Sequence, residues 1–369
     1  MLISGFKNHA ALLVGGILLS SLLAACAGGG SSAVPSGGQE PNTTSPAAAA
    51  SQGLRSMETS LAASGIHVAA ADRAAVATAK TRIGHMYFPY NKYWSKSAAS
   101  APKPASVVFP GDLQYFGGAL VTNSKIFNAY VDSSPGEAGP VVLFEENLNA
   151  SHLIHMADEY VNSTANNRYP FGGNVTVNYP AITTLGDNDL LLILHAVASA
   201  IGPGGYHHIY HIFLPSNIHY CSTGTLLPAG SCDAGGPNPA FCAFHDSVVF
   251  SDIGETLFSL EPHQPLSLCN VDAFTSNPNQ STPNGPQFDS NFSALSHEQM
   301  ETLTDPDPGT GWVNPNPFYP AEIGDLCAYL TGPWVNGFVS PGNTNLDGHP
   351  YRIQFEYSNK QHGCNNSPP

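Results

Sequence analysis

The stretch Ser296-His297-Glu298-Gln299-Met300-Glu301-Thr302-Leu303-Thr304-Asp305-Pro306 decides how the second half of this chain is interpreted. It predicts a helix that ends before Pro306, because a proline disfavours helical geometry at the residue before it. The apolar stripe of this helix consists of Phe292, Leu295, Met300 and Leu303, with Asp289 or Ser290 as its predicted cap. On such a helix His297 and Glu301 lie one turn apart on the same face, close enough to bind one cation.

The spacing of these residues is that of the HExxH metal-binding motif, with Glu301 in place of the second histidine. Glu298 occupies the motif position whose carboxylate takes a proton from a metal-bound water, which predicts a general base. An imidazole and a carboxylate can still bind a divalent ion together. The alternative is an exposed amphipathic helix whose polar face carries this pattern without a function.

Hydrolases of this kind complete the ligand set with a residue further along the chain. Glu322 lies 25 positions after His297 and is the predicted third ligand. Asp305 is the rival third ligand, His245 is a candidate fourth, and Asp325 is expected to orient a ligand from behind. Zinc is the expected cofactor, and calcium or manganese also suits a ligand set this rich in carboxylates.

Composition and charge limit the classes of partner. The chain has 369 residues, of which 11% are charged, and its formal net charge is −15. Because phosphate binding needs clustered positive charge, nucleic acid is excluded as an expected partner. The 36 glycines and 31 prolines predict many irregular loops.

The N-terminus predicts export. Lys7 precedes an apolar run at residues 10–23, which is too short and too rich in small residues for a comfortable membrane span. The run ends Leu23-Ala24-Ala25-Cys26, which resembles the lipobox of bacterial lipoproteins. This resemblance implies a signal peptide over residues 1–25, lipid on Cys26, and an anchor in the cell envelope, at the outer membrane. An ordinary secretory signal is the alternative.

Composition shifts then divide the rest of the chain. Residues 26–52 are rich in Gly, Ser, Pro and Ala and predict a disordered tether. Residues 53–106 predict an extension of weak helices and loops, and residues 107–364 the main domain. Six cysteines beyond Cys26 predict three disulfides, with 15 connectivities open; they are Cys221, Cys232, Cys242, Cys269, Cys327 and Cys364.

The expected elements of the main domain alternate between the two periodicities. Strands are expected at residues 107–109, 125–131, 141–144, 175–179, 206–214, 248–251 and 351–357. Helices are expected at residues 151–161, with Ser151 as the cap, and at residues 187–201. Residues 216–291 predict a long excursion pinned by disulfides. Together these elements predict an α+β fold with a mixed sheet and packed helices, zincin-like by analogy.

Other histidines have weaker claims to a metal. His155 and Glu159 are spaced for one ion, but no catalytic carboxylate accompanies them, so a solvated face is expected. In the strand at residues 206–214, His207 and His211 share a face about 13 Å apart, too far for one ion. His208 points the other way, so at most one of these three histidines is expected to reach a site.

The second half resembles the plant phosphate-induced (EXORDIUM-like) secreted proteins and their bacterial relatives. The resemblance rests on His297-Glu298…Glu301, Thr304-Asp305-Pro306, Gly311-Trp312 and Glu322-Ile323-Gly324-Asp325-Leu326-Cys327. Further agreement comes from Phe116-Gly117-Gly118, Cys242-Ala243-Phe244-His245 and Tyr357-Ser358-Asn359…Gly363-Cys364. Gln299-Met300 and Val313 depart from the family pattern. The resemblance implies export and the His-Glu site, but it supplies no reaction or substrate.

Two functions follow from these residues. The first is a metal-dependent hydrolase, such as a peptidase, with a peptide or cell-wall substrate and Glu298 as its base. The second is a non-catalytic cell-surface protein that holds a structural ion and binds carbohydrate or cell wall. A serine hydrolase is not expected, because the chain has no G-x-S-x-G elbow.

Overall fold

A mixed β-sheet forms the centre of the computed structural model, which describes residues 65–87, 111–132, 135–180, 182–271, 282–315, 321–332, 334–335, 338–339 and 344–369. All of them belong to one unit, Ala50–Pro369. The predicted signal peptide, lipidated Cys26, the tether and the strand at residues 107–109 lie outside the described residues. Among the helices of the described part, none is long and apolar enough to cross a membrane.

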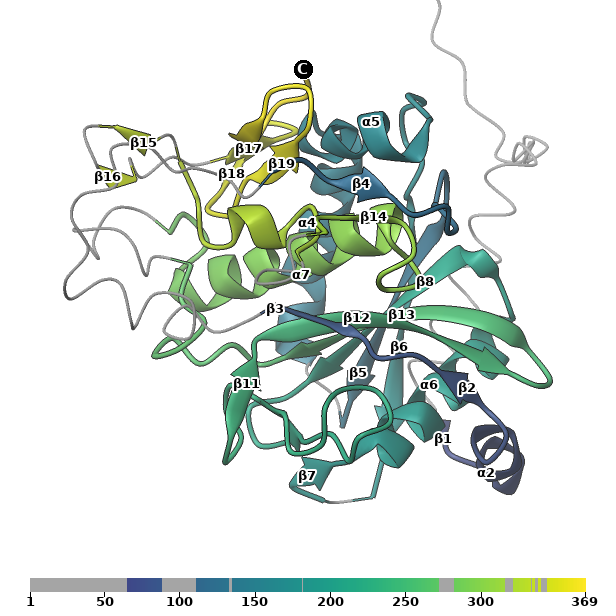
Figure 1. Cartoon of the computed structure of the whole chain (residues 1–369). Coiled ribbons are helices and arrows are strands. Elements are labelled where there is room, and N and C mark those ends of the chain that lie inside the picture. Colours follow the sequence, from purple (N-terminus) through teal and green to yellow (C-terminus); the bar gives the residue numbers. More distant parts are fainter. Residues whose placement is uncertain are drawn as a thin grey trace, which may run out of the picture. The chain divides into compact units, whose positions relative to one another are not determined.

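The sheet has eight strands (Figure 1). Their order is β1 (Ile66–His67), β6 (Phe171–Asn178), β5 (Lys125–Val131), β8 (Gly205–Leu214), β13 (Gly254–Pro262), β12 (Ala243–Phe250) and β2 (Lys80–Thr81), with β3 (His85–Tyr87) also paired to β12. The strands from β1 to β13 pair in parallel. β12, the strand that carries His245, runs antiparallel to β13, β2 and β3, so the strand direction reverses at β12.

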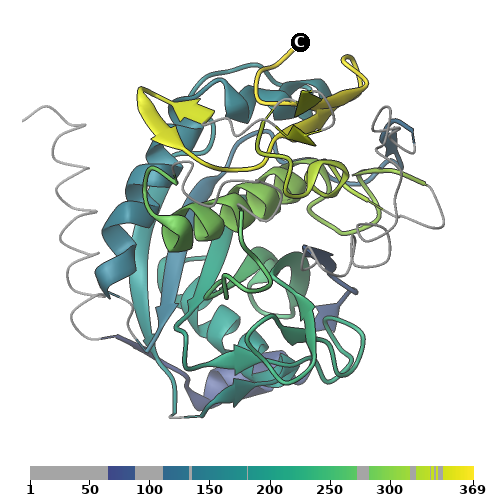
Figure 2. The ribbon, with the colours of Figure 1, turned by 90° about the vertical axis from the view of Figure 1, so that its left-hand side faces the viewer.

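Each face of the sheet is covered by helices. Helices α2 (Ala70–Val76) and α6 (Asp187–Ile201) pack on one face, where Phe127, Tyr210 and Phe258 contribute to the core. The other face carries α4 (Pro135–Ala150), the 3-10 helix η1 (Leu153–Ala157), α5 (Asp158–Val161) and α7 (Pro286–Thr304). α7 passes between this face and the yellow C-terminal strands (Figure 2). The α+β prediction, with a mixed sheet and packed helices, is confirmed.

Pairs of short strands also form in the loops outside the central sheet. The pairs are β4 (Gln114–Tyr115) with β14 (Trp312–Val313), β7 (Thr184–Leu185) with β9 (His219–Tyr220), β10 (Cys232–Asp233) with β11 (Pro239–Phe241), β15 (Trp334–Val335) with β16 (Phe338–Val339), β17 (Thr344–Leu346) with β18 (His349–Tyr351), and β19 (Glu356–Ser358) with β20 (Gly363–Asn365). The three predicted disulfides are confirmed. The cysteines pair in chain order, first with second, third with fourth and fifth with sixth, as Cys221–Cys232, Cys242–Cys269 and Cys327–Cys364.

Several predicted elements match the structure. The helix over residues 187–201 is confirmed as α6, whose first turn is fixed by the Asp189 carboxylate accepting the Gly186 N–H at 2.8 Å. The strand at residues 206–214 is confirmed as β8, one residue longer. Strands β1, β2 and β3 come from the predicted N-terminal extension and join the central sheet.

Two predictions around residue 150 are wrong. Residues 141–144 form part of α4 and not a strand, because Val141, Phe144 and Leu148 fall on one buried helical face. A short apolar run cannot be told from a buried helix by its periodicity alone. The helix predicted at residues 151–161 divides into η1 and α5, since Ser151 accepts the Leu153 N–H and donates to the Leu148 carbonyl, which forms a turn after α4.

Three further predictions need correction. Residues 351–357 are not one strand, because the backbone between β18 and β19 bonds elsewhere, the Gln354 N–H to Ser293 Oγ and the Phe355 N–H to the Leu330 carbonyl. The predicted excursion at residues 216–291 contains two long strands of the central sheet, β13 and the whole of β12, of which only residues 248–251 were predicted as strand. Neither Asp289 nor Ser290 caps α7, which starts at Pro286 after Gly285; both residues are buried inside it.

Candidate metal centre

Helix α7 holds three of the predicted site residues at the middle of the molecule. His297, Glu298 and Glu301 have no exposed surface, and α7 contacts both β12 and β13. The alternative of an exposed amphipathic helix is therefore wrong. A buried helix with polar residues on several faces needs partners for each of them, and strands and loops on different sides supply these partners.

The first set of contacts surrounds His297. Its Nε2 lies 3.0 Å from Glu301 Oε1, as the one-turn spacing predicts, and 3.6 Å from Asp325 Oδ1. Asp325 begins the 3-10 helix η2 (Asp325–Cys327), and its backbone N–H donates to Glu301 Oε1 at 3.1 Å. Asp325 was predicted to orient a metal ligand, and its carboxylate thus lies next to the His297 imidazole. His297 Nε2 has no hydrogen-bond partner in the described part of the chain.

The other side of the His297 ring is held in place. Gln354 Nε2 lies 2.9 Å from His297 Nδ1 and donates to the Gly324 carbonyl at 3.0 Å. The ring of Tyr87 packs on the imidazole with 4.2 Å between centroids. Gly324 lies so close that an added Cβ would come within 2.5 Å of His297 Nδ1. The glycine of the Glu-Ile-Gly-Asp stretch is therefore needed for the close approach of this loop to the histidine.

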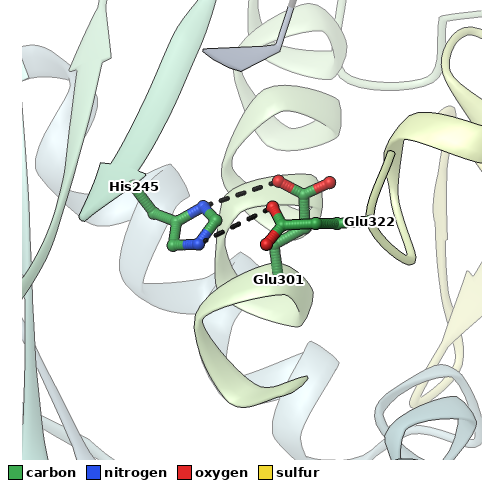
Figure 3. Close-up of side chains that lie close together, drawn as sticks. All are labelled: His245, Glu301 and Glu322. Atoms are coloured by element: carbon green, nitrogen blue, oxygen red, sulfur yellow. Dashed lines mark ion pairs between the residues drawn. The ribbon is translucent and has the colours of Figure 1, made fainter. Parts of the chain in front are cut away.

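The second set of contacts surrounds His245, on β12. Its Nδ1 lies 3.2 Å from Glu298 Oε2 and 3.5 Å from Glu301 Oε2. Its Nε2 lies 3.2 Å from the Asp305 carbonyl oxygen and 3.8 Å from Glu322 Oε2. Figure 3 shows the carboxylates of Glu301 and Glu322 side by side, both facing the His245 ring, Glu301 from the helix and Glu322 from the segment after it. The predicted third ligand, Glu322, and the candidate fourth, His245, thus meet.

Asp305 borders the centre but is engaged elsewhere. Its carboxylate accepts the backbone N–H groups of Gly309 at 2.6 Å, Thr310 at 3.0 Å and Gly311 at 2.5 Å. These bonds fix the turn that follows α7. The geometry therefore favours Glu322 over Asp305 as the third ligand.

Burial and mutual repulsion dominate the electrostatics of the centre. Burial, with repulsion from Glu301 and Glu261, raises the pKa of Glu298 well above its usual range. Burial, with repulsion from Glu301 and Asp305, does the same to the pKa of Glu322. Burial opposes the charged form of His297, but the surrounding carboxylates, Glu301 first, outweigh it and raise its pKa to about 9. The centre thus crowds acidic groups together where water cannot solvate their ionised forms, which favours the protonated forms unless a cation is bound.

Sequence reasoning missed a row of polar side chains that crosses the sheet under α7. His245, Ser259, His211 and Asn128 are register neighbours on four adjacent strands. Ser259 Oγ donates to Glu261 Oε1 at 2.7 Å and lies 2.6 Å from His211 Nδ1. The signal was present as polar residues within strongly apolar strands, but only the strand pairing aligns them.

The remaining histidines make other contacts. His207 lies beside Asn123, His208 beside the Gly202 carbonyl, and His211 beside Ser259. His155 pairs with Asp158 at 2.8 Å, while the Glu159 carboxylate accepts backbone N–H groups near the C-terminus. His155 and Glu159 belong to none of the candidate metal-binding groups found among the described residues.

Two overlapping groups of side chains within the described residues can each hold a metal ion. One is His245, Glu301 and Glu322, and the other is His297, Glu298 and Glu301. Imidazole nitrogens with carboxylate oxygens suit zinc, manganese or another divalent ion of intermediate hardness. In comparisons with known proteins, no family model, no curated protein and no solved structure matches the chain.

Proposed function

We propose that this protein is an exported, lipid-anchored, metal-dependent hydrolase in which Glu298 is the general base. The observation that carries the proposal is the buried His297–Glu301 pair, with His297 Nε2 at 3.0 Å from Glu301 Oε1, beside the Glu298 carboxylate. The residues fit a divalent ion. His297 and Glu301 would hold it, with Glu322 or Asp325 completing the set.

Charge supports a cation at this place. Glu298, Glu301 and Glu322 are fully buried, and Asp325 is 7% exposed. Ionised carboxylates away from water cost several kcal/mol each unless a counter-charge accompanies them. A bound divalent ion supplies that counter-charge, and it also polarises a substrate carbonyl and makes a coordinated water acidic.

Glu298 is suited to moving a proton. Its Oε2 lies 3.2 Å from His245 Nδ1, while its Oε1 has no hydrogen-bond partner in the described part of the chain. Burial and the neighbouring carboxylates raise the pKa of Glu298, and a carboxylate beside the proposed ion can accept a proton and return it.

The finer parts of the proposal rest on the sequence. A zincin-like arrangement is supported by a ligand-bearing helix packed against the strand pair at the antiparallel edge of a mixed sheet. The lipobox-like Leu23-Ala24-Ala25-Cys26 supports a lipid anchor in the bacterial envelope, and the EXORDIUM-like motifs support export. Zinc is the proposed ion, and the proposed substrates are peptides or cell-wall polymers.

Complete burial favours a second candidate function. Because His297, Glu298 and Glu301 have no exposed surface, a structural ion beneath a surface that binds carbohydrate or cell wall would also suit this geometry. The two functions differ in the need for Glu298. A structural site does not require a base next to the ion.

Glu298→Gln separates the two candidates. If Glu298 is the base, hydrolysis of a fluorogenic peptide library falls at least ~100-fold while the zinc content, measured by mass spectrometry, is unchanged. Glu146→Gln, an exposed glutamate on α4, is the matched control and should leave both readouts unchanged. Stoichiometric zinc without any hydrolysis would leave the structural function, and protein purified without a divalent ion would remove both.

A further inference from the structure

We propose that the centre holds two divalent ions bridged by the carboxylate of Glu301, one beside His297 and the other beside His245. This inference rests on the proposed function, since it adds a second ion to the same centre. Ions bridged in this way lie about 3.5–4 Å apart in hydrolases that use a pair of metals.

The two oxygens of Glu301 face different histidines. Oε1 lies 3.0 Å from His297 Nε2, and Oε2 lies 3.5 Å from His245 Nδ1. A carboxylate that serves a single ion directs one or both oxygens to one point. Here the two oxygens divide between two imidazoles that come from different elements, one from α7 itself and one from β12.

Each half of the centre has its own further carboxylate. Asp325 Oδ1 lies 3.6 Å from His297 Nε2, and Glu322 joins His245 and Glu301 in a group whose ligand atoms all lie within 4.8 Å of one another. Among the described residues, neither candidate group contains both histidines. Ligands of one zinc ion, with bonds of about 2.0–2.2 Å, cannot be further apart than twice that length. Glu301 is the residue that both groups share.

The state of His245 agrees with a ligand role. A carbonyl oxygen only accepts hydrogen bonds, so the contact between Nε2 and the Asp305 carbonyl at 3.2 Å places the proton on Nε2. The lone pair of Nδ1 is then directed at Glu298 and Glu301. A backbone carbonyl that holds the distal N–H is the usual orienting partner of a metal-ligating histidine.

The number of carboxylates matches two ions. Glu298, Glu301, Glu322 and Asp325 each approach one of the two histidines within 4 Å. When ionised, these four groups carry four negative charges. One divalent ion leaves half of that buried charge uncompensated, whereas two ions balance it.

Metal stoichiometry tests the proposal. The mature chain would be stripped with a chelator, titrated with Mn²⁺ by calorimetry, and measured by electron paramagnetic resonance. The expected result is two Mn²⁺ per chain with the spectrum of an exchange-coupled pair. One Mn²⁺ per chain would overturn the second ion and leave the proposed function intact, while no binding would overturn both.

A variant locates the second ion. His245→Gln should reduce the stoichiometry from two to one and abolish the exchange coupling, while the ion at His297 remains. His362→Gln is the matched control, because His362 is an exposed histidine paired with Asp112 at 2.9 Å. Two uncoupled ions in the unaltered chain would overturn the Glu301 bridge. Because the spectrum of the unaltered chain decides this point, the test does not depend on the variant folding.

Discussion

At the scale of single residues, Gly324 has a sharply defined role. The His297 ring occupies the space that any larger side chain at this position would need. The same glycine offers its carbonyl to Gln354, which in turn contacts His297. One small residue therefore sets both the distance and the orientation of the loop that brings Asp325 to the centre.

Gly324→Ala should displace His297 and weaken zinc binding by about 10-fold or more, as changes behind a metal ligand commonly do. The physical reason is the 2.5 Å approach of the added Cβ to the ring. Competition with a chromophoric chelator measures the affinity. Gly139→Ala is the control, since nothing lies within 4 Å of its Cβ and alanine favours the helix there. Equal zinc affinity in the two variants would contradict this role for Gly324.

The local part of the centre could be predicted from the sequence, and the non-local part could not. His297, Glu298 and Glu301 follow from helical spacing alone. His245 ranked only as a candidate fourth ligand because its position depends on the pairing of β12 with β13, which no local pattern encodes. Gln354 was missed because residues 351–357 alternate as a strand would, although the segment lies buried between α7 and the loop at Gly324.

At the scale of elements, the loop that carries Glu322 and Asp325 is held in place by a disulfide bond, here called the clamp. Cys327, at the end of η2, is bonded to Cys364 on β20, across a sequence separation of 37. The Cys221–Cys232 disulfide has a separation of only 11, and it closes a loop whose Leu226 and Leu227 pack in the core on the α6 side of the sheet. The Cys327–Cys364 bond therefore holds a segment that contributes to the centre, whereas the Cys221–Cys232 bond does not.

Replacing Cys327 and Cys364 by serine should lower the free energy of unfolding by about 4 kcal/mol and also weaken metal binding. Replacing Cys221 and Cys232 should cost about 3 kcal/mol, because the closed loop is shorter, and should leave metal binding unchanged. Denaturant titration and calorimetry measure the two effects. If both variants lose metal affinity equally, the clamp has no specific role at the centre.

Elements with a single strong period could be predicted, and ambiguous ones could not. α6 is apolar on nearly all sides, bounded by Asp187 and Gly202, and its limits match the prediction. β13 was missed because Gly, Pro and Cys around it suggest loops, yet a central strand buried on both faces needs no alternation of apolar and polar residues. The run at residues 141–144 became helix because the neighbouring turns of α4 supply further buried positions.

At the scale of the whole molecule, the buried acids make stability depend on pH. Burial raises the pKa of Glu261 to about 8 against an ordinary value of 4.5, and the carboxylates around His297, despite its burial, raise its pKa to about 9 against 6.5. Both groups hold protons in the folded state that the unfolded chain has already lost. Their contribution to stability is complete below the ordinary values and is lost as the pH rises through 8 and 9.

The metal-free protein should therefore melt at a lower temperature at pH 9 than at pH 6.5, the window that these two groups define. Zinc should flatten or reverse this trend, because the ion favours ionised carboxylates. Scanning calorimetry with and without a chelator measures both curves. A metal-free melting temperature that is constant or rises over this range would show that these groups do not govern stability.

The polar residues that converge on α7 come from segments that are distant along the chain: β12, α7 itself, the turn after it and the stretch before β19. Before folding, only the one-turn pair on α7 is preassembled, and two donors bind an ion weakly. High affinity for the proposed ion would require all these segments to have docked, so the folded chain would bind the ion tightly and a partly folded chain only weakly. Tight retention of the ion would thus distinguish a correctly folded chain from a partly folded one.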